Sequence, residues 1–366
     1  MSSIKKETLA GGKTSWIVRY RDDEDKSVER RFRTRADAER FEVSVKHAIY
    51  LGEYVDPKAG KVAFRTVAED WRCNAMHSAN TVMLVKSRLY VNVYPTLGGR
   101  PIASIRPADI QKLVKTLSAT LAPSTVEGIY SHVATIFGDA VDNRIITKSP
   151  CVGIKLPKAQ KRQVVPLPEE TVHAIFELIS RRFRNLARVA AGTGMRQGEL
   201  FGLTIDRVDF LRNEIRIDRQ VQLIDGQPQF TKPKSLASYR TIPVPEAVLD
   251  AIADQIERYG LGPDGLVFTG RTGQPLRRSS FHSVWAPLNT AFGLPKGTGL
   301  HALRHFYASM LIRAGASVKV VQERLGHASA METLDTYAHI WADDDDRTRN
   351  AVRDFFDGPG SASEAA

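Results

Sequence analysis

The sequence predicts a mainly helical α+β protein built from more than one domain. Its 366 residues exceed the size of one ordinary domain. Apolar residues recur at helical spacing along most of the chain, whereas alternating, strand-like runs occur only near the N-terminus and between residues 215 and 244. Charge is also segregated, because residues 58–162 hold 16 Lys and Arg against 6 Asp and Glu. A small sheet-plus-helix domain, an all-helical basic domain and a larger mixed domain are therefore expected.

Residues 1–57 are predicted to form the sheet-plus-helix domain. Apolar residues alternate over positions 16–20, and a second strand-like run covers positions 28–33. Thr34 with Asp37 three residues later signals the start of a helix. The strands carry five arginines that either bind DNA or lie in solvent, namely Arg19, Arg21, Arg30, Arg31 and Arg33.

Residues 62–154 are predicted to be entirely helical. The apolar spacing favours helices near residues 66–74, 79–93, 107–118 and 123–143, with a break over 95–101, where two prolines stand. A basic linker follows at residues 155–164, and a positively charged tether suits a protein that wraps around a duplex. The net charge of +11 also makes a polyanionic partner plausible.

Residues 165–349 form the predicted mixed domain. Helices come first, then alternating Ile215 and Ile217, a polar turn at Asp225-Gly226, two further short strands, and helices to about Ile340. This order predicts a small antiparallel sheet among helices. In the C-terminal tail, residues 350–366, an amphipathic helix over 347–356 is expected to dock on a neighbouring protomer or on its own domain. The Gly/Ser/Ala-rich end of the tail is expected to be disordered.

The composition argues against several classes of protein. No apolar run reaches the 18 or more residues of a membrane span, and the N-terminus lacks the apolar segment of a signal peptide. A cytoplasmic protein with no membrane partner is therefore expected. Cys73 and Cys151 belong to no Cys/His cluster, so no zinc site is predicted.

Two glycines precede a short predicted helix that begins near Arg196. The segment Gly192–Leu200 does not match the glycine spacing of a dinucleotide-binding loop. The better interpretation holds Arg196 at a helix start, where its guanidinium and free amides both face a phosphate. Glu199 either orients this arginine or pairs with a surface charge.

A second motif, His301-Ala-Leu-Arg-His305, opens a helix with an apolar stripe on the opposite side. His301, Arg304 and His305 share one face. Two histidines four residues apart can bind a metal, but the arginine between them would repel a cation. His327 and Tyr337 follow on or beside later helices, and each alone would be interpreted as a structural residue.

Taken together, these segments resemble the signature boxes of the tyrosine recombinases, specifically the phage-type integrases. The resemblance is carried by Thr193-Gly-Met-Arg-Gln-Gly-Glu-Leu200, His301-x-Leu-Arg-His305, Leu325-Gly-His327 and Thr333-Leu-Asp-Thr-Tyr-Ala-His339. The helical middle domain resembles the family's core-site-binding domain. Residues 1–57 resemble its arm-site-binding domain less specifically.

The resemblance implies a set of catalytic residues. Tyr337 would be the nucleophile, and Arg196 and Arg304 would clamp the phosphate oxygens with a hydrogen bond from His327. His301 would accept the proton of the tyrosine. A lysine on a β-hairpin would protonate the leaving 5′ oxygen, and the distance back from Arg240 favours Lys234 over Lys232 for this role. The six candidates are Arg196, Lys234, His301, Arg304, His327 and Tyr337.

The implied function is site-specific recombination, integrating or excising a phage or other mobile element through a 3′-phosphotyrosyl intermediate. Neither a metal nor another cofactor is expected. The implied partners are double-stranded DNA at core and arm-type sites, three further protomers in a homotetramer, and host or element-encoded DNA-bending factors, all at the nucleoid. The alternatives are an Xer-like resolvase, a type IB topoisomerase-like enzyme, a non-catalytic DNA-binding regulator and a metal-dependent nuclease.

Overall fold

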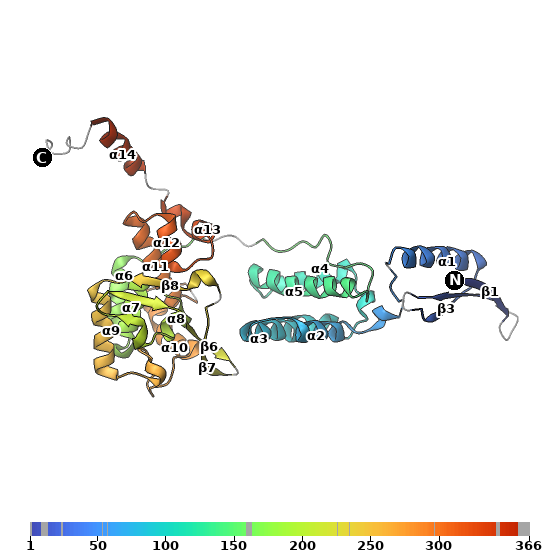
Figure 1. Cartoon of the computed structure of the whole chain (residues 1–366), viewed down its shortest axis with the longest axis horizontal. Helices are drawn as coiled ribbons and strands as arrows, with labels where there is room; N and C mark the ends of the chain where they lie inside the picture. The colour runs from blue at the N-terminus through green and yellow to red at the C-terminus, as the bar shows by residue number, and fades with distance from the viewer. Residues whose placement is uncertain are drawn as a thin grey trace. The chain divides into compact units, whose positions relative to one another are not determined.

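A computed structural model describes residues 2–8, 14–22, 25–52, 54–56, 58–158, 163–224, 226–233, 235–295, 297–341 and 345–357. The chain divides into two compact units, residues 1–160 and 161–366 (Figure 1). Within the described ranges, no helix is both long enough and apolar enough to cross a membrane.

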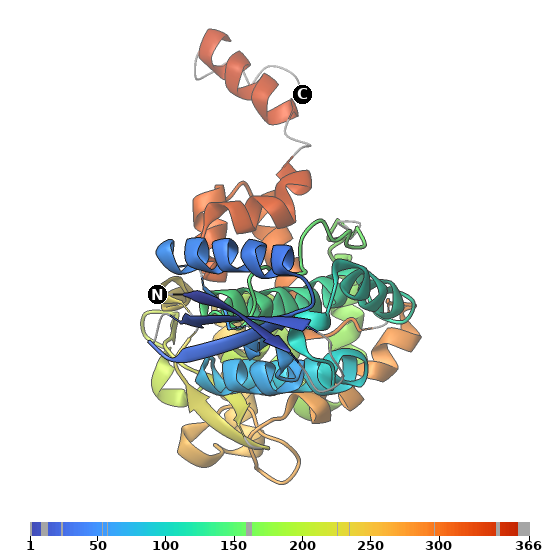
Figure 2. The same ribbon diagram turned by 90° about the vertical axis from the view of Figure 1, so that its right-hand side faces the viewer.

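The N-terminal part of the first unit is a three-stranded antiparallel sheet. Its strands lie in the order β1 (Ser3–Thr8), β2 (Thr14–Arg21) and β3 (Ser27–Phe32), and helix α1 (Arg35–Tyr50) lies along one face (Figure 2). Buried Val18 and Tyr20 pack with Ala38 of α1. The Thr34 hydroxyl accepts a hydrogen bond from the Asp37 amide, so the helix begins where the sequence indicates. Strand β1 was not expected, because its polar sequence has no apolar alternation.

The strand arginines have partners within this sheet. Arg19 forms an ion pair with Glu29, and Arg31 lies 3.3 Å from the Glu7 carboxylate. The Arg30 guanidinium lies 4.6 Å from the ring centroid of Phe41. Part of the basic surface therefore stabilises the sheet itself, whatever it binds.

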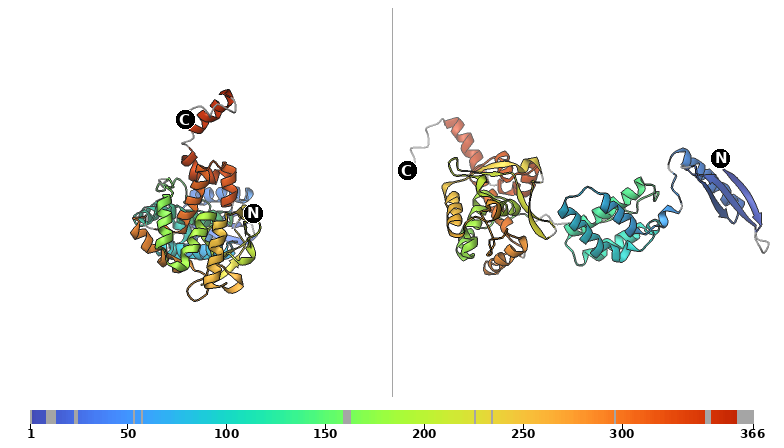
Figure 3. Two further views of the ribbon diagram at one scale, coloured as in Figure 1. Left: turned by 90° about the vertical axis from the view of Figure 1, so that its left-hand side faces the viewer. Right: turned by 60° about the horizontal axis from the view of Figure 1, so that its bottom comes forward.

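The rest of the first unit is helical. Helices α2 (Phe64–Asn74), α3 (Ala79–Arg88), α4 (Pro107–Ser118) and α5 (Pro123–Asp142) pack around a common core (Figure 3). The helix break was predicted at 95–101, but in the structure the helix ends later. A π-helical segment, η2 (Leu89–Gly98), continues past Pro95. In an α-helix the proline ring clashes with the carbonyl four residues earlier, and the wider π turn relieves this contact. Short 3₁₀ turns η1 (Ala59–Lys61) and η3 (Ile102–Ser104) flank these helices.

Over its described residues, the second unit combines helices with two small antiparallel sheets. Strands β4 (Val208–Asp209), β5 (Glu214–Ile217) and β8 (Arg240–Pro243) pair in that order, and β6 (Gln220–Ile224) and β7 (Gln227–Thr231) form a separate hairpin. The helices are α6 (Glu169–Leu178), α7 (Arg181–Thr193), α8 (Gln197–Phe201), α9 (Glu246–Tyr259), α10 (Arg278–Ala291), α11 (Leu300–Arg313), α12 (Val318–Leu325), α13 (Ala330–Trp341) and α14 (Asp345–Asp357). The predicted mainly helical α+β fold class is confirmed.

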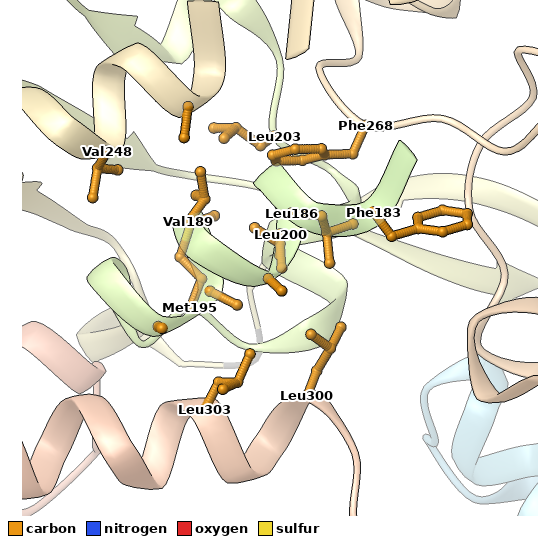
Figure 4. Close-up of a cluster of buried hydrophobic side chains, with 14 of the residues drawn as sticks. Phe183, Leu186, Val189, Met195, Leu200, Leu203, Val248, Phe268, Leu300 and Leu303 are labelled. Carbon is orange, nitrogen blue, oxygen red and sulfur yellow. The ribbon is translucent and has the colours of Figure 1, made fainter. Parts of the chain in front are cut away.

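The core of this unit brings α7, α8 and α11 together. Leu186 and Val189 of α7 and Leu200 of α8 lie on one side, and Leu300 and Leu303 of α11 point at them from below (Figure 4). Burying side chains of this size stabilises the contact by about 1.5–3 kcal/mol each. The apolar stripe of α11 thus fixes the start of α8 beside the first turns of α11, and their polar residues converge.

Candidate active site

Arg304 lies at the centre of the converging segments. Its side chain is only 2% exposed. One terminal nitrogen donates to the Gly194 carbonyl and the other to the Leu325 carbonyl, both at 2.7 Å. Burial and then the neighbouring Arg196 lower the pKa of Arg304 to about 9, which still leaves it charged at neutral pH. A buried cation needs such partners, so Arg304 ties three of the sequence boxes to one point.

Arg196 approaches the same point from the start of α8. It donates to the Gly326 carbonyl at 2.7 Å and to the Glu199 carboxylate at 3.1 Å. The same carboxylate accepts the Arg196 backbone N–H at 2.9 Å and caps the helix. One third of the Arg196 side chain is exposed, so its guanidinium is held in place while part of it is open to a ligand.

Glu199 is a buried anion that serves two arginines. Besides Arg196, it accepts a bidentate pair of hydrogen bonds from Arg240, at 3.1 and 2.7 Å. Burial by itself would raise the pKa of Glu199, but the bonds from Arg240 and the charge of Arg196 hold this pKa below its ordinary value. Of the two alternatives for Glu199, orientation of Arg196 agrees with the contacts, and the second partner is a buried arginine rather than a surface charge.

His327 follows Gly326, which ends α12 with a left-handed φ of +66°. Its Nδ1 lies 2.9 Å from the hydroxyl of Thr333, at the start of α13. Burial, then the charges of Arg304 and Arg196, lower the pKa of His327 to about 3, so the imidazole is neutral at pH 7. A neutral imidazole has a single N–H, so with Nδ1 held by Thr333 the other nitrogen, Nε2, which lies 3.8 Å from a Glu332 carboxylate oxygen, can donate one hydrogen bond.

Tyr337 lies on α13 and is 1% exposed. Its phenolic oxygen is 2.8 Å from Nδ1 of His305. His301, the expected proton acceptor, contacts His305 one turn later on the same helix. The rings of His301 and His305 meet edge-on, with centroids 4.5 Å apart. Burial raises the pKa of Tyr337 to about 12, while Arg304 acts against this. The phenol therefore carries its proton at neutral pH.

The remaining candidate, Lys234, lies outside the described residues. Its alternative, Lys232, has an exposed side chain, and its carbonyl accepts a hydrogen bond from Gln220 at 3.0 Å. The assignment of the lysine stays a prediction. Among the side chains that the structure describes, no three His, Cys, Asp or Glu gather into a metal-binding group.

Comparison with known proteins identifies the family. The model of the phage integrase family matches residues 166–343, and the model of the phage integrase central domain matches residues 64–156. The chain belongs to the phage integrase family. This recombinase is therefore an enzyme that transfers DNA strands in site-specific recombination, and the family expected from the four sequence boxes is confirmed.

Individual relatives agree. The recombinase is 29% identical to a "Tyrosine recombinase XerC-like" protein of Caldanaerobacter subterraneus subsp. tengcongensis over 67% of this chain and 70% of that protein. It is 25% identical to the integrase of Mycobacterium phage D29 over 82% and 83% of the two chains. In fold it is similar to the Tn1549 transposon integrase bound to circular intermediate DNA, with a TM-score of 0.69 at 22% identity, covering 80% of this chain and 99% of that one.

Two residues of this recombinase contact the site in a way that the sequence did not predict. His305 was considered only as a possible metal ligand with His301 on the polar face of the helix, and Arg240 only as a spacing marker for the lysine. Their partners, Tyr337 and Glu199, are 32 and 41 residues away in the chain. A histidine one turn after His301 was a signal, because it shares the polar face of α11. No local signal pointed to Arg240.

Substitution of Gly194 tests how closely α11 packs against the turn before α8 in the recombinase. It has a φ of +62°, and an added Cβ would lie 2.4 Å from the Tyr307 ring. Gly293 has a similar φ of +59° but open space around it. An alanine at either position costs about 1–2 kcal/mol for the left-handed backbone, and crowding at Gly194 adds about 1–3 kcal/mol. Urea unfolding of Gly194→Ala and Gly293→Ala is expected to show this difference, and equal losses would contradict it.

Proposed function

We propose that this recombinase integrates or excises a mobile DNA element, such as a phage genome, by forming a 3′-phosphotyrosyl bond on Tyr337. One observation carries the proposal. Hydrogen bonds to the backbone of Gly194, Leu325 and Gly326 gather Arg304 and Arg196 where α8, α11 and the end of α12 meet. Tyr337 and His327 reach the same region from the next helix and the turn before it.

The two arginines would bind the nonbridging oxygens of the phosphate that is cleaved. Each guanidinium can give two parallel hydrogen bonds to such oxygens, and its charge offsets the charge that develops in the transition state. His327 would add one hydrogen bond from a neutral imidazole. His301 is exposed and lies within the influence of the same arginine charges. Desolvation lowers the pKa of His301, and the charges of Arg304, Arg196 and Arg278 lower it further.

The chemistry then proceeds as two reversible transfers. The Tyr337 oxygen attacks phosphorus, the bond to the 5′ oxygen breaks, and that oxygen takes a proton, for which Lys234 is the proposed donor. The phosphotyrosyl bond conserves the free energy of the phosphodiester, so a 5′-hydroxyl from a second duplex can reseal the strand without a nucleotide. Because Tyr337 is 1% exposed, the groups that cover its oxygen have to move aside before the phosphate can reach it.

The proposed partners are double-stranded DNA and further copies of the chain. The segment of greatest positive charge, residues 58–162, includes the central domain and would bind the core site. Residues 1–57 would bind arm-type sites, and host or element-encoded DNA-bending factors at the nucleoid would bring the two kinds of site together. A lambda integrase structure, whose fold is similar with a TM-score of 0.59 at 17% identity over 86% of this chain, is a tetramer bound to a Holliday junction. We propose a homotetramer on DNA for this chain as well.

Helix α14 offers a test of the tetramer. Phe355 and Phe356 are 81% and 77% exposed, an unusual position for two aromatic side chains. If they dock on a neighbouring protomer, the double variant Phe355→Ser, Phe356→Ser is expected to bind and cleave one site as the wild type does. Its tetramer on paired sites should weaken by about tenfold or more, measured by light scattering of the DNA complex. Loss of single-site cleavage instead would indicate that α14 packs on its own domain.

A recombination assay tests the proposed function. Supercoiled plasmids would carry paired sites selected from the DNA that adjoins the gene. Exchange between the sites in excess EDTA, with no relaxation of a plasmid that lacks them, is the expected result. Relaxation of any plasmid without sequence demand would favour the topoisomerase-like alternative. Loss of cleavage in EDTA would favour the metal-dependent nuclease.

A further inference from the structure

The hydrogen bond between His305 and Tyr337 joins two helices that pack together. His305 lies on α11 and Tyr337 on α13, and their rings meet edge-on at 65°, with centroids 5.6 Å apart. The 2.8 Å contact is made by Nδ1 and the phenolic oxygen, so the imidazole points an atom at the reacting oxygen rather than its ring face. This geometry is what a proton acceptor for Tyr337 requires.

The direction of the hydrogen bond follows from the protonation of both groups. Tyr337 holds its proton at neutral pH, and a buried O–H needs an acceptor. Among the residues that the structure describes, the groups that face His305 are His301 and Arg304 on its own helix, His327 after α12, and Tyr337 on α13. Burial, then His301 and Arg304, lower the pKa of His305 to about 4, so its imidazole is neutral and has one nitrogen that accepts. The phenol therefore donates to Nδ1.

Bound DNA would make His305 a stronger base. The scissile phosphate brings a negative charge between Arg196 and Arg304, and an anion nearby favours the charged form of an imidazole. The same charge offsets the arginine that now opposes protonation. At the same time, the phenolic oxygen becomes far more acidic as its bond to phosphorus forms. The proton transfer is thus unfavourable before DNA binds and becomes favourable at the moment of attack.

We infer that His305 is the general base of strand cleavage in this recombinase. The phenolic proton of Tyr337 passes to Nδ1 while the bond from the phenolic oxygen to phosphorus forms and the bond to the 5′ oxygen breaks. The 5′ oxygen takes its proton from the general acid, for which Lys234 is the candidate. On resealing, Nδ1 returns the proton to Tyr337. His301 is then left to donate a hydrogen bond to the phosphate. The inference rests on the proposed role of Tyr337 as the nucleophile.

His305→Asn is the variant that separates a base from a mere anchor. An Asn amide oxygen can occupy the place of Nδ1 and accept the phenolic hydrogen bond, but it cannot take up the proton at neutral pH. Cleavage of a nicked half-site in single turnover is expected to fall by about 10²- to 10⁴-fold, as much as in His305→Ala. DNA affinity and thermal stability should stay near those of the wild type. The rise of the wild-type rate with pH should be absent in His305→Asn.

A substrate with sulfur at the bridging 5′ position shows which of the two proton transfers a variant has lost. A thiolate leaves without a proton, so this substrate should rescue variants that lack the general acid but not His305→Asn. His301→Asn is the matched comparison on the same helix face and should keep the pH dependence. His305→Asn cleaving within about threefold of the wild type, or rescue of it by the sulfur substrate, would overturn the inference. Absence of a wild-type adduct would instead overturn the role of Tyr337.

Discussion

Tyr337→Phe is expected to abolish the covalent protein–DNA adduct while preserving the fold. The phenylalanine ring fills the same buried space on α13, and only the oxygen and its hydrogen bond to His305 are lost. Loss of that bond costs about 1 kcal/mol of folding free energy. Removal of a nucleophile, by contrast, lowers the rate by about 10⁶-fold in covalent enzymes. Denaturing gels of the protein incubated with a nicked half-site measure the adduct directly.

The matched control is Tyr307→Phe. Tyr307 is also buried and lies on α11, one turn from Arg304, so its substitution removes a similar hydroxyl from a neighbouring position. This variant is expected to keep adduct formation. If Tyr307→Phe lost the adduct, or Tyr337→Phe kept it, the assignment of the nucleophile would be wrong.

Glu199→Gln is expected to cause a large loss of folding stability. The carboxylate is 3% exposed and bonded to Arg196 and Arg240, so its neutralisation leaves an uncompensated buried cation. Breaking a buried ion pair in this way costs about 3–5 kcal/mol. Glu323→Gln, which alters the exposed pair with Lys319, should cost about 1 kcal/mol or less. Urea unfolding compares the two.

The effect of Glu199→Gln should depend on pH. Because the folded-state pKa of Glu199 lies below its ordinary value, its contribution to stability is complete above that ordinary value of about 4.3. The contribution is lost as pH falls through the lower, folded-state pKa. The difference in unfolding free energy between wild type and Glu199→Gln should therefore be constant near neutral pH and shrink in acid. A difference that grows on acidification would contradict the ion-pair account.

Much of the site could be predicted from local sequence, because the hydrogen-bond acceptors that hold its arginines are backbone carbonyls within the motifs. Arg304 bonds to the carbonyls of Gly194 and Leu325, and Arg196 to that of Gly326. Each of these glycines and leucines belongs to a box that could be recognised from its own few residues. The strands at Ile215 and Ile217 and the helix start at Thr34 were predictable for the same reason, since a short-range pattern determines them.

Features that depend on packing between distant segments were not predictable. The bond from His305 to Tyr337 exists because α11 and α13 cross there, and nothing within either helix specifies that crossing. The Arg240 bond to Glu199 depends likewise on strand β8 lying beside α8 and α12. Strand β1 is held by pairing with β2 rather than by its own polar sequence. The break predicted at Pro95 was wrong because a π-helix tolerates a proline where an α-helix does not.

The central claim, that Tyr337 becomes covalently joined to DNA, is tested most directly by mapping the adduct. The protein would be trapped on a nicked half-site, digested with protease, and the peptide carrying the nucleotide sequenced by mass spectrometry. The account predicts a 3′-phosphate linked to Tyr337 in the peptide from α13. A linkage to Tyr307 or to the exposed Tyr239 would contradict it.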